Sequence, residues 1–181
     1  IISKDRIRTN LLRKSEQRAL SYLVQRIPSW VFPDLLTFIG FLGSLTVLLS
    51  FILATYINSY FLLLGLAGFF INWFGDSLDG RLAIYRNKSR KWYGFSLDLS
   101  IDWTTTIVIG LGFVFYTEGV GELLGYGFVV LYGWAMITTL LRYKITGEYT
   151  IDSGLLGPTE VRIIISAILV TEVIIKGSIV W

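Results

Sequence analysis

Four aspartates, Asp76, Asp79, Asp98 and Asp102, are the residues of this sequence best suited to chemistry. Asp76 and Asp79 are three residues apart and Asp98 and Asp102 are four apart, so each pair lies on one face if its segment is helical. The sequence contains no Cys and no His, which excludes thiol nucleophiles, Cys/His zinc sites and histidine bases. A metal bound here would therefore have oxygen ligands, which suit Mg²⁺, Mn²⁺ or Ca²⁺.

These aspartates lie in or beside apolar stretches, where burying a carboxylate has a cost. One carboxylate at the centre of a membrane helix costs roughly 2.5–3.5 kcal/mol, and four unpaired ones would cost on the order of 10 kcal/mol. Little positive charge lies on the faces that carry them, whereas divalent cations would offset their charge. We favour a metal site; the alternative is that the carboxylates only reach the membrane interface as topology signals.

The composition is that of a membrane protein. Hydrophobic residues make up 54% of the 181 residues and charged residues 16%, whereas soluble domains are about 25% charged. The mean hydropathy is +0.64. These values exclude an ordinary soluble domain and predict an all-α, polytopic membrane helix bundle.

Five apolar runs, each near the ~20 residues that cross a bilayer, are expected to position the aspartates. The second and third runs would carry the two pairs as antiparallel helices joined by a short loop, so that both pairs lie near one membrane surface. Before them, apolar and basic residues alternate at helical spacing, as in an amphipathic helix that lies in the headgroup layer or packs as an ordinary surface helix. We expect an N-terminal juxtamembrane region at 1–30 and a transmembrane catalytic domain at 31–181, with the amphipathic helix at 3–27 and spans at 34–56, 59–84, 93–116, 122–143 and 160–180.

The basic residues predict the orientation in the membrane. Seven of the sixteen Lys and Arg precede residue 30, five more lie at 81–91, and the first and third loops contain none. Because positive charge marks the cytoplasmic side, the N-terminus and the aspartates are expected there, in the inner or cell membrane if the protein is bacterial. The pI of about 9.2 then reflects contact with anionic lipid headgroups, and we expect no nucleic-acid partner.

A longer motif surrounds the aspartates. Residues 76–102 read DSLDGRLA, then ten residues, then GFSLDLSID. This run resembles the signature of the CDP-alcohol phosphotransferases, which is D-x-x-D-G-x-x-A-R, a short spacer and G-x-x-x-D-x-x-x-D. The run from Pro33 to Gly40 is similar to the family's P-N-x-L-T-x-x-G. Two positions depart from the pattern, because Ile84 stands where the family has Arg and Asp34 where it has Asn.

The resemblance implies a site for two divalent ions, either Mg²⁺ or Mn²⁺. Asp76, Asp79 and Asp98 would be the main ligands, and Asp102 would lie close to one of the ions. Asp102 would also be the general base that takes the proton of the acceptor hydroxyl.

The resemblance further implies a site for the nucleotide of the donor. Gly80 and Ala83 would leave room for the cytidine, and Thr37 belongs to the upstream run that contributes to this site. Arg81 lies one helical turn before the position of the missing Arg, and we expect it to take over part of that residue's role.

The activity implied by the resemblance is transfer of a substituted phosphate group with release of CMP, in phospholipid biosynthesis. The donor would be CDP-diacylglycerol or a CDP-headgroup, and an alcohol in or at the lipid bilayer would be the acceptor. Family members usually have six spans and form homodimers, so both are expected here. The acidic residues leave two alternatives, a membrane cation transporter and an Asp-rich prenyltransferase.

The identity of the acceptor is not indicated by the motif. Arg142, Lys144 and Arg162 flank the expected cytoplasmic ends of the fourth and fifth spans. They could hold a phosphorylated acceptor, or they could be positive-inside charges that only fix the topology.

Overall fold

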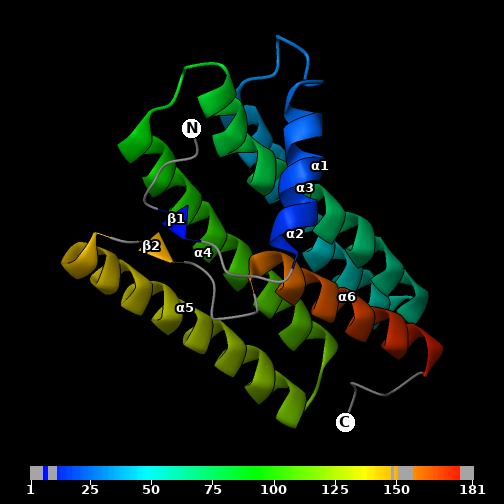
Figure 1. Cartoon of the computed structure of the whole chain (residues 1–181). Helices are drawn as coiled ribbons and strands as arrows, with labels where there is room; N and C mark the ends of the chain where they lie inside the picture. The colour runs from blue at the N-terminus through cyan, green and yellow to red at the C-terminus, as the bar shows by residue number, and fades with distance from the viewer. Residues whose placement is uncertain (1–5, 8–11, 148, 151–156, 176–181) are drawn as a thin grey trace.

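A computed structural model describes residues 6–7, 12–147, 149–150 and 157–175, and it confirms the all-α, polytopic prediction (Figure 1). Within these residues, four helices are long and apolar enough to cross a membrane, and their ends agree with the predicted spans to within three residues. The predicted fifth span at 160–180 continues past the described residues. The elements are β1 (Arg6–Ile7), α1 (Arg13–Val24), α2 (Pro33–Tyr56), the short 3-10 helix η1 (Ser59–Phe61), α3 (Leu62–Tyr85), α4 (Lys91–Tyr116), α5 (Val120–Thr146), β2 (Tyr149–Thr150) and α6 (Pro158–Ile174).

The amphipathic helix is shorter than the sequence predicts. It is described as α1 over Arg13–Val24, and Arg6–Ile7, which we predicted to be helical, instead pair in parallel with Tyr149–Thr150. The prediction is wrong at this end because the periodicity is local, whereas the strand partner lies far along the chain. Leu20 of α1 is fully buried against the bundle, so the apolar side of α1 packs on protein.

Two hydrogen bonds that a buried carboxylate accepts tie α1 to the bundle. Glu16 is 7% exposed and accepts hydrogen bonds from Trp73 Nε1 at 3.2 Å and from Thr159 Oγ1 at 2.8 Å. Trp73 belongs to α3 and Thr159 to the first turn of α6. The amphipathic helix therefore contacts both a helix that carries the aspartates and the start of α6.

Arg86, just after α3, holds the connection between α1 and α2. Its Nη2 donates to the backbone carbonyls of Ile27 at 3.1 Å and Pro28 at 2.8 Å. Its Nη1 donates to the carbonyls of Ser29 and Val31. Because the guanidinium is shared among four carbonyls, it fixes this connection against the end of α3.

Helices α2 and α3 pack backbone against backbone through glycines. A side-chain carbon added at Gly43 would overlap the backbone of Asn72, and one added at Gly75 would overlap the backbone of Gly40. Small residues permit such close approach of membrane helices. The contact at Gly75 fixes how α3 lies against α2, and Gly75 is the residue directly before Asp76.

Replacing Gly75 with Ala should therefore destabilise the protein. Overpacking a close contact costs about 1–3 kcal/mol, which should lower the melting temperature of the purified chain in detergent micelles. Gly127 on α5 is the matched control, since nothing lies within 4 Å of a carbon added there. Gly127→Ala should leave the melting temperature unchanged or raise it, because Ala favours the helix by about 1 kcal/mol. Equal melting temperatures for the two variants would show that the glycine contact does not limit stability.

Candidate metal and substrate site

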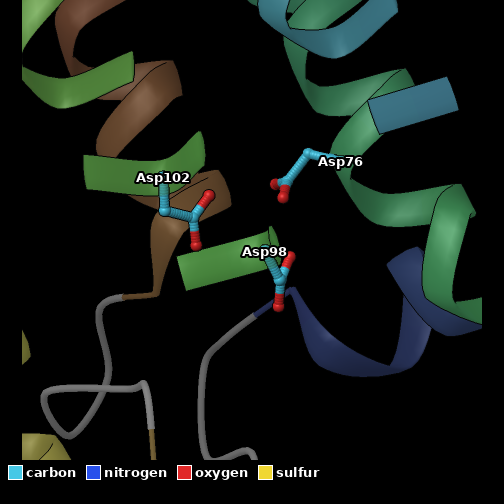
Figure 2. A group of neighbouring side chains, drawn as sticks. All are labelled: Asp76, Asp98 and Asp102. Atoms are coloured by element: carbon cyan, nitrogen blue, oxygen red, sulfur yellow. The ribbon is translucent and has the colours of Figure 1, made fainter. Parts of the chain in front are cut away.

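Three of the four aspartates converge between α3 and α4, two helices that both pack against α2. Figure 2 shows Asp76 from α3 and Asp98 and Asp102 from α4 turned toward a common space. Each offers one carboxylate oxygen, and these oxygens all lie within 4.8 Å of one another. The side-chain spacings on the two helices predicted this convergence, and it is found for these three residues.

Asp79 lies apart from this group of three and has its own partners. Its Oδ2 accepts a hydrogen bond of 2.6 Å from Thr37 Oγ1 of α2, and its Oδ1 accepts one from the backbone N–H of Gly80. Thr37, which was predicted from the run Pro33 to Gly40, thus lies beside an aspartate of the motif at residues 76–102. The predicted role of Asp79 as a metal ligand stays a prediction.

The site includes a cation that the sequence did not lead us to expect there. Arg162 Nη2 of α6 is 2.6 Å from Asp76 Oδ2, and the side chains are 14% and 24% exposed. The inference that little positive charge lies near the aspartates is therefore wrong for Asp76. The sequence does show that Arg162 is the one basic residue of α6. The residues around it in the sequence, however, do not indicate which helix its side chain faces.

A hollow between α2, α3 and α4 is lined mainly by oxygen-bearing side chains. Its lining consists of Thr37, Gly40, Asn72, Asp76, Asp98, Ile101 and Asp102. Asn72 was not predicted to be a site residue; its Nδ2 donates to the carbonyl of Gly40 at 3.0 Å. Its buried Oδ1 has no hydrogen-bond partner within the described part of the chain. Three carboxylates and an unused amide oxygen are the donor set that Mg²⁺ and Mn²⁺ prefer, so the residues fit such an ion.

The predicted nucleotide-binding residues lie on the next turns of α3. A side-chain carbon at Gly80 would meet nothing within 4 Å, so there is space beside this residue. Ala83 and Arg81 are half-buried, and Ile84, at the position of the missing Arg, is exposed. The predicted use of these residues in donor binding agrees with the space beside Gly80 but is not tested by it.

Asp34, which stands where the family pattern has Asn, forms an ion pair. Arg90 Nη2 lies 2.7 Å from both carboxylate oxygens of Asp34. This ion pair links the start of α2 to the residue before α4. Asp34 therefore joins two helices that line the hollow, a contact that an Asn could make only without the charge.

The three basic residues considered for the acceptor do not share one environment. Arg162 points at Asp76, whereas Arg142 and Lys144, near the end of α5, are exposed. Of the three, only Arg162 is found in contact with the aspartates.

Comparison with known families agrees with the motif. The family model described as CDP-alcohol phosphatidyltransferase matches residues 30–181, which includes every helix that lines the hollow. No curated protein matches the chain.

The ion pair with Arg162 should stabilise the protein most when no metal is bound. Arg162→Gln leaves Asp76 without this counter-charge. Removing one partner of a buried pair costs about 3–5 kcal/mol, and we expect about 1–3 kcal/mol because both side chains are partly exposed. Mn²⁺ should recover part of the loss, so the rise in melting temperature on adding Mn²⁺ should be larger in the variant than in the original chain.

Arg142→Gln is the control, because Arg142 is exposed on α5. It should change neither the melting temperature nor the effect of Mn²⁺. If Arg162→Gln behaves like Arg142→Gln in both measurements, the ion pair does not stabilise the site.

Proposed function

Because this chain belongs to the CDP-alcohol phosphatidyltransferase family, we propose that it is a divalent-metal-dependent enzyme of phospholipid biosynthesis. It transfers a substituted phosphate group from a CDP-linked alcohol to an acceptor hydroxyl and releases CMP. The observation that carries the proposal is the convergence of Asp76, Asp98 and Asp102 beside a hollow within the apolar bundle. Family membership favours this reading over a cation transporter or an Asp-rich prenyltransferase.

Four carboxylates would hold two divalent ions, either Mg²⁺ or Mn²⁺. Asp76, Asp98 and Asp102 already offer clustered oxygens, and Asp79 is one helical turn from Asp76. When bound, the ions would withdraw charge from the diphosphate of the donor and stabilise the departing CMP. Thr37 keeps the Asp79 carboxylate oriented through its hydrogen bond.

Asp102 acts as the general base. Its carboxylate lines the hollow and belongs to the cluster, so an acceptor hydroxyl that enters would lie within its reach. As the hydroxyl oxygen bonds to the β-phosphorus of the donor, its proton passes to the Asp102 carboxylate. The bond from the β-phosphorus to the bridging oxygen breaks, and that oxygen leaves as part of the phosphate of CMP. General-base catalysis of this kind contributes about 10²–10⁴-fold.

The donor nucleotide lies along the open side of α3. Gly80 leaves space for a flat group, Ala83 is the next small residue on this side, and Arg81 supplies positive charge near the missing Arg. The donor is CDP-diacylglycerol or a CDP-headgroup; both present the same nucleotide to these residues.

The site opens to the cytoplasm in this proposal. The aspartates lie toward the ends of α3 and α4 that are joined by the basic loop 86–90, and positive loops remain on the cytoplasmic side. A soluble substrate can then reach the hollow from water while a lipid substrate enters from the bilayer. The enzyme acts as a homodimer, as expected from its family.

The direct test is CMP release by the purified chain from CDP-alcohols in the presence of Mg²⁺ or Mn²⁺. Asp102→Asn should lower turnover by about 10²–10⁴-fold, since an amide cannot take the proton, while Mn²⁺ still binds. Asp76→Asn is the matched variant and should weaken Mn²⁺ binding itself. Near-normal turnover by Asp102→Asn would overturn the assignment of the base, and no CMP release from any donor would overturn the proposed function.

The space beside Gly80 gives a separate prediction. Gly80→Leu should fold normally but raise the KM for the CDP-alcohol roughly 5- to 150-fold, since filling a binding space costs about 1–3 kcal/mol. Gly127→Leu is the control, because it also enters open space and lies on a helix away from the motif. A KM that rises equally in both variants, or in neither, would remove Gly80 from the donor site.

A further inference from the structure

Asn72 is a buried polar residue that the proposed mechanism does not use. It lies on α3, four residues before Asp76 and on the same helical face, and is 3% exposed. An apolar side chain would be the ordinary choice at this depth of a membrane helix. The presence of a buried amide at position 72 therefore needs a physical explanation.

The contact between α2 and α3 accounts for the NH₂ group of the Asn72 amide but not for its oxygen. Its Nδ2 donates to the carbonyl of Gly40 at 3.0 Å. Because a carbonyl can only accept, the NH₂ group must face Gly40, which fixes Oδ1 as the remaining atom. This Oδ1 is buried and has no partner among the described residues. A buried acceptor left without a donor costs about 1–3 kcal/mol.

The surroundings of Asn72 limit what its partner can be. It lines the same hollow as Asp76, Asp98 and Asp102. Ionised carboxylates only accept hydrogen bonds, so these neighbours cannot satisfy an amide oxygen. A cation or a water molecule can do so, and the three carboxylates that line the same hollow favour a cation. Amide oxygens are ordinary ligands of hard divalent ions.

We propose that Asn72 Oδ1 is a further ligand of the divalent-metal site, either directly or through a metal-bound water. The inference rests on the metal dependence of the proposed function and adds to it a neutral ligand outside the aspartate motif. There is a physical reason for this ligand to be a neutral amide. Four carboxylates already balance two divalent ions in formal charge, so another aspartate would add charge to an apolar bundle, whereas an amide adds only an oxygen.

The test compares two variants that lose the same hydrogen bond to Gly40. Asn72→Leu removes the oxygen, and Asn72→Asp keeps an oxygen with added charge. Mn²⁺ affinity is measured on the purified full chain without substrate, by EPR of the free ion. Loss of a residue that supports a metal site weakens binding about 10–100-fold, so Asn72→Leu should bind Mn²⁺ at least about tenfold more weakly. Asn72→Asp should bind as tightly as the original chain or more tightly.

Two results would overturn the inference. If Asn72→Leu binds Mn²⁺ like the original chain, the oxygen is not part of the site. If Leu and Asp weaken binding equally, Asn72 acts only by joining α2 to α3. Asp76→Asn is measured in parallel. Loss of binding there, with none in Asn72→Leu, removes the inference and leaves the proposed function intact, whereas no Mn²⁺ binding by the original chain removes both.

A second measurement leaves Asn72 itself unchanged. Asn10, Asn58 and Asn87 are exchanged for Gln, so that ¹³C-asparagine labels position 72 only. Electron–nuclear double resonance of bound Mn²⁺ should then show a ¹³C hyperfine coupling. Bound Mn²⁺ without that coupling would contradict the inference.

Discussion

An apolar helix bundle that carries several carboxylates at one level must offset their repulsion, and the rest of this structure depends on how it does so. Like charges a few ångströms apart disfavour ionisation, and burial removes the water that would screen them. The glycine contact of α2 and α3 brings Thr37 within hydrogen-bond distance of Asp79, and α6 brings Arg162 to Asp76. The clustered oxygens that remain are suited to a divalent cation.

The site is therefore shared among more helices than the motif covers. The motif supplies the aspartates from α3 and α4, whereas α2 and α6 supply partners that orient them. Glu16 of α1 binds Thr159 in the first turn of α6, three residues before Arg162 starts the next turn. The amphipathic helix thus contacts the element whose arginine reaches the aspartates, which links the N-terminal segment to the site.

The sequence was sufficient to predict those features that depend on residues close to one another along the chain. Hydropathy over about 20 residues fixes a span, and spacings of three and four fix a helical face, so the spans and the convergence of Asp76, Asp98 and Asp102 were predictable. The Arg162–Asp76 pair joins residues 86 positions apart. The Asn72 oxygen, which has no partner within the described ranges, depends on the position of Gly40 in another helix. Neither has a local signature, because both arise from packing. The strand at Arg6–Ile7 was missed for the same reason.

The central claim is that Asp76, Asp98 and Asp102 bind divalent cations together at one place. Low-temperature EPR of the purified chain loaded with Mn²⁺ tests it most directly. The account predicts a bound pair of ions with coupled spins, and loss of that coupling in Asp98→Asn. A spectrum that stays that of the free aqua ion, or that is identical in the two chains, would contradict it.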